Sequence, residues 1–185
     1  MKHLCTVTLA CIALTPFGAV AQDMPSLENE CLNDHAGLVK SADRRAIERI
    51  CAKAKRDGAT LMLVTVSSLD DFTPRPLNVD RFASRIFDEW DVGYEQARDA
   101  VMLFVARRER EFRIVAGDGY PDRLRRRAVA TIRARLVPQA RRGRYSRGLR
   151  NTMQALYDKV VKPYVREKKR KLRRERMKRG ILDGP

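Results

Sequence analysis

Hydrophobic residues in the middle of the chain fall into short runs with either helical or strand-like spacing. Apolar positions three and four residues apart predict a helix over residues 41–56, which begins with Ser41 as its N-cap and ends at Gly58. The run TLMLVTVS at residues 60–67 is short and apolar, and it predicts a buried strand. The same criteria predict helices over residues 79–90, 121–136 and 147–161, and strands over residues 100–106 and 111–116.

The order of these elements predicts the fold class. Only the charged residues 107–110 separate the last two strands, which predicts a β-hairpin. The strand at 100–106 is apolar throughout and is expected in the centre of the sheet, whereas the strand at 111–116 alternates and is expected nearer an edge. Because strands alternate with helices and the hairpin excludes an all-parallel sheet, we expect an α/β fold: a three-layer α/β/α sandwich with a small mixed sheet.

The N-terminal segment has the pattern of a secretory signal peptide. Lys2 precedes a largely apolar, uncharged stretch, and Ala19-Val20-Ala21 is the small-x-small motif after which signal peptidases cut. A transmembrane anchor is the alternative, although the stretch is at the short limit of a membrane span. We expect export, to the periplasm or by secretion, with no transmembrane segment after cleavage. The expected divisions are residues 1–21 (signal peptide), 22–161 (α/β domain) and 162–185 (basic C-terminal tail).

Cysteine usage agrees with export. Cys5 and Cys11 belong to the signal segment, which leaves Cys31 and Cys51 in the mature chain. An even pair in an oxidising compartment predicts one disulfide. Two buried free thiols or a redox pair are the alternatives, but the spacing is far from the C-x-x-C motif.

Positive charge is concentrated in the C-terminal third of a chain whose net charge is +16. Residues 22–120 contain fifteen basic and eighteen acidic side chains, whereas residues 121–185 contain twenty-three basic and five acidic ones. The segment 162–179 is almost continuously charged, so we expect it to be disordered or a solvated helix and to contribute no core residues.

The partner expected for this basic region is an anionic membrane surface or an acidic envelope protein complex. Nucleic acid is not expected, because an exported protein rarely meets it and Tyr164 is the only aromatic residue in the segment. A tail that only increases solubility is the alternative. The residues expected to make the docking contacts are Lys168, Lys169, Arg170, Lys171, Arg173 and Arg174.

An ordered set of short motifs resembles the TPM domain family, over roughly residues 31–156. Asp99-Ala100 stands where that family often has Asp-Asn-Gly. The motifs are LNDHAGL at residues 32–38, FDEWDVG at residues 87–93, Asp99 with the strand after it, RIVAGDGY at residues 113–120, and Pro138 with Gly143-Arg144-Tyr145, near where the family has P-x-F-x-x-G-x-Y.

The resemblance implies an α/β/α sandwich and two properties credited to family members, calcium binding and acid phosphatase activity. Calcium prefers hard oxygen ligands on loops, and the candidate ligands next to strands are Asp34, Asp99 and Asp118. A turn-forming role is the alternative for Asp34 and Asp118. Arg123 and Arg125 are candidates to hold a phosphate, unless they only continue the basic surface.

The sequence contains few of the residue combinations that conventional catalytic sites use. His35 is the only histidine after the signal segment, so a nucleophile–base pair with histidine would depend on it. We therefore expect an exported, TPM-like accessory protein that docks through its basic C-terminal region. The alternative is a metal-dependent phosphatase of the cell envelope that acts through the three aspartates.

Overall fold

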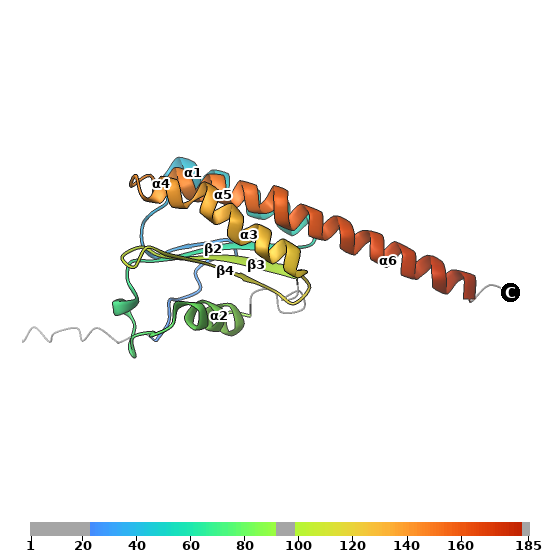
Figure 1. The fold of residues 1–185 in the computed structure, drawn as a ribbon, viewed down its shortest axis with the longest axis horizontal. Coiled ribbons are helices and arrows are strands. Elements are labelled where there is room, and N and C mark those ends of the chain that lie inside the picture. Colours follow the sequence, from blue (N-terminus) through green and yellow to red (C-terminus); the bar gives the residue numbers. More distant parts are fainter. Residues whose placement is uncertain (1–22, 92–98, 183–185) are drawn as a thin grey trace, which may run out of the picture.

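A four-stranded mixed sheet forms the middle layer of the structure (Figure 1). The structure is a computed structural model, and it describes residues 23–91 and 99–182. In spatial order, the strands are β1 (Leu32–Asp34), β2 (Thr60–Val66), β3 (Ala100–Ala106) and β4 (Glu111–Ala116). β1, β2 and β3 are parallel, and β4 is antiparallel to β3. The predicted central and edge positions of the hairpin strands are confirmed.

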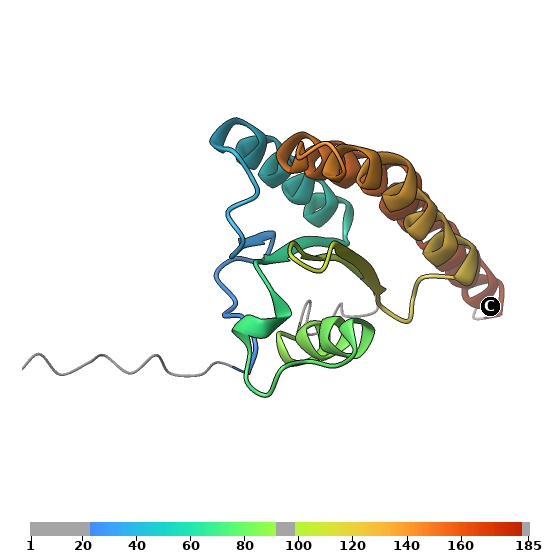
Figure 2. The same cartoon turned by 60° about the vertical axis from the view of Figure 1, so that its left-hand side comes forward.

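Helices cover both faces of the sheet (Figure 2). They are α1 (Ser41–Asp57), α2 (Val79–Glu89), α3 (Asp122–Arg135), α4 (Val137–Ala140), α5 (Tyr145–Leu156) and α6 (Lys162–Leu182), with a 3-10 turn at Leu69–Asp71 and a π-helical segment at Tyr157–Val161. α2 packs on one face, whereas α1, α3 and α5 pack on the other. This arrangement confirms the predicted three-layer α/β/α sandwich.

Side-chain alternation along β2 and β3 divides the core into two clusters, because successive residues of a strand point to opposite faces. Leu63 and Leu103 belong to the cluster beneath α1, α3 and α5. Val64 and Phe104 belong to the cluster above α2. There, the ring of Phe104 meets Phe82 of α2 edge to face, with centroids 5.9 Å apart.

The connections that follow β1 and β2 leave the sheet on opposite sides. α1 and α2 lie on opposite faces, although both connect parallel neighbours in the same direction across the sheet. The two crossovers therefore have opposite hands, and one of them has the left-handed sense that is rare in proteins. Their divergence makes the carboxyl ends of β1 and β2 a topological switch point, which is where open α/β sheets bind ligands.

Three local features differ from the prediction. Residues 32–34 form β1, a strand that the sequence analysis does not predict, and the buried Asn33 organises the segment before it by accepting the backbone N–H groups of Glu28 and Asn29. The N-cap of α1 is Lys40 rather than Ser41, and it makes no side-chain cap hydrogen bond. α4 and the 3-10 turn span four and three residues, too few to leave a periodic signal in the sequence.

α5, the π-helical segment and α6 follow one another without a break and form a helical rod from Tyr145 to Leu182 (Figure 1). The basic segment is therefore helical rather than disordered. Tyr164 and Val165, in the first turn of α6, are 7% and 6% exposed and belong to the core above the sheet. The expectation that the segment after residue 161 contributes no core residues is wrong for this turn.

The predicted signal segment, with Cys5 and Cys11, lies outside the described residues. Within residues 23–91 and 99–182, no helix combines the length and the apolar character that a membrane span requires. Cleavage after Ala21 and export remain predictions from the sequence.

The predicted disulfide between Cys31 and Cys51 is confirmed. The two Cα atoms are 5.8 Å apart, and Cys51 lies on the face of α1 that packs against the sheet. The bond fastens the residue just before β1 to the helix above it. It therefore secures the shortest strand of the sheet, which is also an edge strand.

Removing this disulfide should destabilise the protein. The variant Cys31→Ala/Cys51→Ala releases a link with a sequence separation of 20 residues, which is expected to lower the free energy of unfolding by about 3 kcal/mol. Urea denaturation measures the difference. The wild type in reducing agent should lose a similar amount, and the variant should be insensitive to reductant. Equal stability of the variant and the oxidised wild type would contradict this expectation.

Candidate functional site

A buried carboxylate at the amino end of β3 holds the root of α6. Asp99 immediately precedes β3 and is 3% exposed. Its two carboxylate oxygens accept hydrogen bonds from the Tyr164 hydroxyl and the Lys168 ammonium, both on α6. A buried carboxylate is strongly unfavourable unless it is paired, so these contacts offset its loss of hydration. Asp99 therefore ties α6 to the sheet.

Two tyrosines cover this contact. The rings of Tyr120 and Tyr164 are stacked, with centroids 4.0 Å apart. The Tyr120 hydroxyl donates to the backbone carbonyl of Asp99 at 3.2 Å. Burial, together with the neighbouring Tyr164 and Asp99, raises the pKa of Tyr120 far above its ordinary value. The hydroxyl therefore stays protonated and remains a hydrogen-bond donor.

A cavity of about 700 Å³ opens beside this contact. Its lining includes Gly119 and Pro121 from the turn after β4, and Lys171, Leu172 and Glu175 from α6. Acidic and basic side chains both border it, so the lining does not favour a ligand of one charge.

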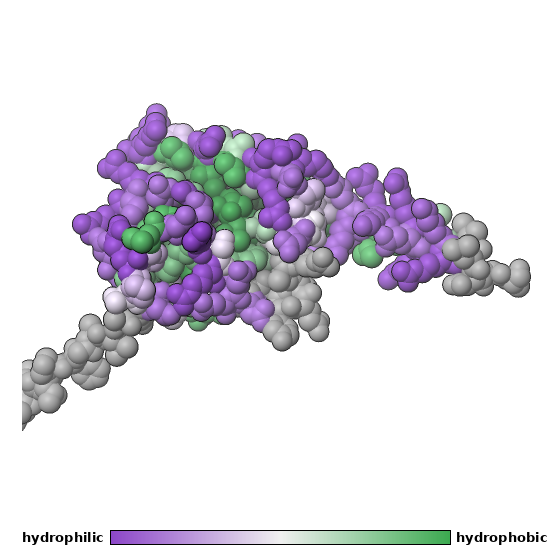
Figure 3. Space-filling view, turned by 60° about the horizontal axis from the view of Figure 1, so that its bottom comes forward, coloured by the Kyte–Doolittle hydropathy of each residue, from purple (hydrophilic) through white to green (hydrophobic). Residues whose placement is uncertain are grey.

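Beyond its root, α6 projects from the domain as an exposed basic helix (Figures 1 and 3). Every residue from Lys168 to Arg179 is exposed, and Figure 3 shows the projecting helix as almost entirely hydrophilic on the face in view. Of the predicted docking residues, Lys168 is paired with Asp99. The other five have no ion pair or side-chain hydrogen bond with the described part of the chain; they are Lys169, Arg170, Lys171, Arg173 and Arg174.

The two predicted phosphate contacts, Arg123 and Arg125, bind groups of the protein itself. Arg123 pairs with Glu167 of α6. Arg125 donates from three nitrogens to three backbone carbonyls in and beside the turn after β4, at 2.7 to 2.9 Å, and lies 3.7 Å from Asp118. Arg125 therefore closes this turn, and Arg123 adds a second link between α3 and α6.

Asp34 lies at the carboxyl ends of the parallel strands, opposite to the end where Asp99 lies, and organises the loop that follows β1. Its carboxylate accepts the backbone N–H groups of Leu38 and Val39 at 2.9 and 2.8 Å and the Thr65 hydroxyl at 2.5 Å. The Arg44 guanidinium is 3.8 Å away, and the Asp34 side chain is 1% exposed. These contacts give Asp34 the turn-forming role.

The three predicted cation ligands do not meet. The strand registers align Asp34 with Thr65 and Val105, six residues along β3 from Asp99, a separation of about 20 Å at the usual rise of a strand. The Asp118 side chain is 92% exposed. The prediction that these aspartates converge on one ion is therefore wrong. In the described ranges, no group of three or more His, Cys, Asp or Glu side chains is placed to hold a metal.

Sequence reasoning missed the part that Tyr120, Tyr164 and Glu167 play in anchoring α6. A signal for Tyr164 was present, because the apolar spacing of the last predicted helix continues past its expected end, whereas the spacing gives no signal for Glu167. The buried residues that carry this spacing into α6 are Tyr157, Val160, Val161, Tyr164 and Val165.

The anchor predicts a difference between two adjacent lysines. Lys168→Gln removes the cation that faces the buried Asp99 carboxylate, whereas Lys169→Gln removes a charge with no partner among the described residues. Lys168→Gln should lower the free energy of unfolding by about 1–2 kcal/mol, less than for a fully buried pair because Lys168 is 43% exposed. Lys169→Gln should change it by less than about 0.5 kcal/mol. Equal stabilities in chemical denaturation would contradict the anchor.

Two of the aspartates should also respond differently to substitution. Asp34→Asn places an amide donor against backbone N–H groups and should lower the free energy of unfolding by about 1–3 kcal/mol. Asp118→Asn, at an exposed side chain, should change it by less than about 0.5 kcal/mol. Thermal or urea unfolding of both variants measures this. A loss at Asp118 as large as that at Asp34 would contradict the roles described above.

Solved structures with the same fold are known. The solution structure of the N-terminal domain of a protein from P. gingivalis is similar with a TM-score of 0.60 and 23% identity, over 72% of this chain and 83% of that chain. The solution structure of the N-terminal domain of the cg2496 protein from Corynebacterium glutamicum is similar with a TM-score of 0.53 and 13% identity, over 77% and 87%. Among curated proteins, no sequence matches this chain.

The sequence match to a protein family covers the sandwich itself. Residues 32–159 match the family model of the TPM domain. The match begins at β1 and ends within the π-helical segment, so it contains the whole sheet and the helices on both of its faces. This protein therefore belongs to the TPM domain family.

Proposed function

We propose that this protein is an exported accessory protein of the cell envelope that docks through α6 onto an anionic membrane surface. The observation that carries the proposal is the charge and exposure of the projecting helix. Between Lys168 and Arg179, α6 has nine basic residues and one acidic residue, and all of these positions are exposed. Lys168 is held by Asp99, which leaves eight cations for a surface outside the protein.

The distribution of these cations favours a diffuse anionic surface over a shaped protein partner. They surround the helix, and Leu172 and Met177 are the exposed large hydrophobic residues along it. Without an apolar face, α6 is suited to contact lipid headgroups electrostatically and not to insert into the acyl chains. Each Lys or Arg near an anionic leaflet contributes about 1 kcal/mol, so several cations acting together are enough for attachment.

The anchor at Asp99 gives this docking a fixed geometry. Twenty-one residues of helix extend about 31 Å, and the Debye length at physiological ionic strength is about 8 Å. The end of α6 is therefore screened from the acidic side chains of the domain. The contacts of Tyr164, Glu167 and Lys168 keep the helix from pivoting freely at its root.

Export is part of the proposal and has two independent supports. The N-terminal sequence has the signal-peptide pattern, with Ala19-Val20-Ala21 as the cleavage motif. The pair Cys31–Cys51 forms a disulfide, and such bonds persist in oxidising compartments such as the periplasm. Both features favour a location outside the cytoplasm.

The positions of the three aspartates do not favour the alternative of a metal-dependent phosphatase that acts through them. That mechanism needs Asp34, Asp99 and Asp118 around one ion, and the strand registers place Asp34 and Asp99 at opposite ends of the strands. Arg123 and Arg125, its proposed phosphate contacts, are held by Glu167 and by backbone carbonyls.

Vesicle binding by two charge-matched variants tests the proposal. Arg173→Gln/Arg174→Gln/Arg176→Gln/Lys178→Gln removes four cations from α6. The control removes four exposed cations from α3, Arg126→Gln/Arg127→Gln/Arg133→Gln/Arg135→Gln. The wild type should sediment with vesicles that contain phosphatidylglycerol and not with pure phosphatidylcholine. The α6 variant should bind more weakly by roughly two to three orders of magnitude, and the α3 variant much less so.

The wild type should also dissociate as salt rises, because each contact is screened. Equal weakening of both variants would show that net charge alone matters and would overturn docking through α6. Binding that ignores salt would do the same. If the wild type avoids anionic vesicles but captures polyglutamate through α6, the partner is an acidic protein and the membrane proposal fails.

A further inference from the structure

The two edge strands of the sheet differ in what protects them. β1 has three residues, and the chain before it folds against it through hydrogen bonds to Asn33. β4 has six residues without a proline, and it pairs with β3 in continuous register from Glu111 to Ala116. Within residues 23–91 and 99–182, no strand pairs with its other side. Natural edge strands are usually protected by short length, prolines, bulges or projecting charges, so β4 is unusually open to pairing with another chain.

The strand register shows which backbone groups of β4 point outward. Gly117 donates its N–H to the carbonyl of Ala100 at 2.9 Å, so these two residues form a hydrogen-bonded pair at the end of the β3–β4 ladder. Such pairs recur at every second residue of an antiparallel ladder, and the residues between them point their backbone groups the other way. The residues of β4 whose N–H and C=O groups point away from β3 are therefore Phe112, Ile114 and Ala116.

Donors outnumber acceptors among these outward groups. Arg125 donates to the carbonyl of Ala116 at 2.7 Å, and Arg113 donates to that of Phe112 at 3.1 Å. The carbonyl of Ile114 and all three N–H groups have no partner in the part of the chain that the structure describes. A strand added to this edge would supply carbonyl oxygens for the three N–H groups, which is the mode of peptide recognition called β-augmentation.

An apolar strip accompanies the open edge on the α3 side of the sheet. Phe112 and Ile114 are partly exposed and pack against the core beneath α3. Val129 of α3 is 42% exposed. It lies one helical turn after Arg125, which binds the last residue of β4, so it stands on the flank of α3 that faces this edge. Because side chains alternate along a strand, every second residue of an added strand would contact this strip.

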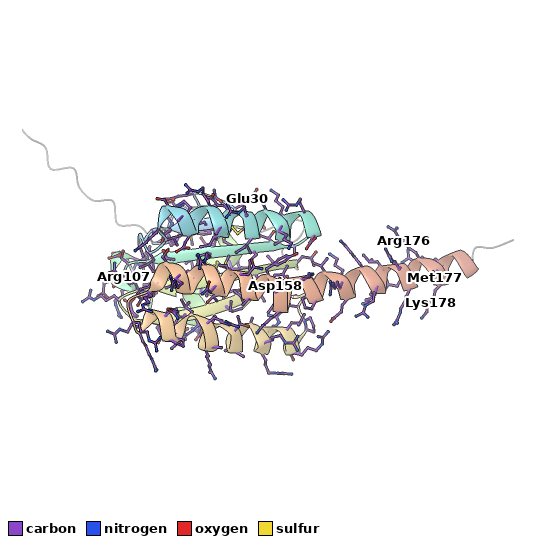
Figure 4. The ribbon with its side chains drawn as sticks, turned by 90° about the horizontal axis from the view of Figure 1, so that it is seen from above. Glu30, Arg107, Asp158, Arg176, Met177 and Lys178 are labelled. Carbon is purple, nitrogen blue, oxygen red and sulfur yellow. A yellow bond between two sulfur atoms is a disulfide. The ribbon has the colours of Figure 1, made fainter. Side chains whose placement is uncertain are left out.

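Unpaired cations border the apolar strip. Seen from above, α3 is the outermost of the three helices on this face of the sheet, on the side of β4 (Figure 4). Arg133 lies two turns after Arg125 on the same flank of α3, and Arg110 immediately precedes β4. Both are exposed, and neither has an ion pair or a side-chain hydrogen bond in the described ranges. On the α2 side, in contrast, Arg113 is neutralised by two carboxylates, one of them from α2.

We propose that the outer edge of β4 binds an extended peptide segment of a partner protein, in which apolar side chains and carboxylates share one face. The backbone carbonyls of the peptide accept the open N–H groups of β4. Its apolar side chains cover Phe112, Ile114 and Val129, and its carboxylates pair with Arg110 and Arg133. Charge disfavours a second copy of this protein as the occupant. Pairing two β4 edges would bring two α3 helices together, each with six arginines and one acidic residue.

The edge is separate from the docking part of α6. Arg123, on the other flank of α3, pairs with Glu167 of α6. Residues 176–178, which Figure 4 labels, lie at the far end of α6 and away from the domain. Substitutions beside β4 therefore leave the docking helix intact, and failure of one proposal does not imply failure of the other.

Amide hydrogen exchange with the synthetic peptide acetyl-ETVTVTE-amide tests the proposal. In an extended strand, the valines and glutamates of this peptide share one face and the threonines share the other. In nuclear magnetic resonance spectra of the free protein, the amides of Phe112, Ile114 and Ala116 should exchange fast. Saturating peptide should slow them at least about tenfold, whereas the amides between them should change little because they already bond to β3.

Two charge reversals on α3 separate recognition at the edge from non-specific attraction. Arg133→Glu reverses a cation beside β4, whereas Arg127→Glu reverses an exposed cation one turn after Arg123, on the other flank. Arg133→Glu should weaken binding of the peptide by about fivefold to tenfold and should strengthen binding of acetyl-KTVTVTK-amide. Arg127→Glu should change both affinities by less than about twofold. Titrations followed by chemical shift measure these affinities.

Four results would overturn the proposal. Equal weakening by the two charge reversals would reduce the binding to net charge. Binding of the peptide without protection of Phe112, Ile114 and Ala116 would place it elsewhere on the protein. Protection of these amides in the free protein that rises with protein concentration would show that a second copy occupies the edge. The absence of saturable binding of acetyl-ETVTVTE-amide would also contradict the proposal.

Discussion

All seven residues of β3 are completely buried, and this strand imposes the architecture around it. A strand without an exposed face needs a hydrogen-bonding neighbour on each edge and a packed layer on each side, because neither its backbone groups nor its side chains can turn to water. β2 and β4 are the hydrogen-bonding neighbours of β3. α2 supplies one layer, and the helices that pack against Leu103 and Val105 supply the other. The opposite crossover directions, and with them the switch point, follow from the need to cover both faces.

The burial of β3 also fixes where α6 begins. Asp99 stands at the point where the chain enters the interior, and its carboxylate is satisfied by two groups of α6. The core thus continues into the first turn of α6, whose remaining turns are exposed to solvent. As a result, the strongly basic arm is attached to the domain at a defined place.

Most of the fold could be predicted from the sequence because its signals are long and periodic. The strand at 100–106, the hairpin and the helical spacing over 41–56 and 79–90 all correspond to observed elements. β1 escaped prediction because it has three residues and two of them, Asn33 and Asp34, are polar. Their side chains satisfy loop backbone groups, an arrangement that local pattern cannot distinguish from a turn.

The sites were less predictable than the fold. Composition located the basic segment in the sequence, but it could not show that Lys168 pairs with Asp99, 69 residues away. The aspartates were grouped because each lies next to a strand, and only the strand registers show that Asp34 and Asp99 lie at opposite ends of the strands. A cavity at the carboxyl ends of the parallel strands escaped notice for a related reason. Lys40, Arg107 and Arg144 belong to separate loops, and the topology brings them together in its lining.

The exposed part of α6 contains like charges one helical turn apart, such as Lys169 with Arg173 and Arg170 with Arg174. Such pairs repel each other and weaken a helix, and α6 has few packing contacts there to oppose the effect. Anions that gather along the helix relieve this self-repulsion. Salt therefore acts on α6 in two opposed ways, since it supports the helix while it screens the attraction to a membrane. An anionic bilayer would supply counter-charge without that loss, so the proposed docking would also favour the helical form of α6.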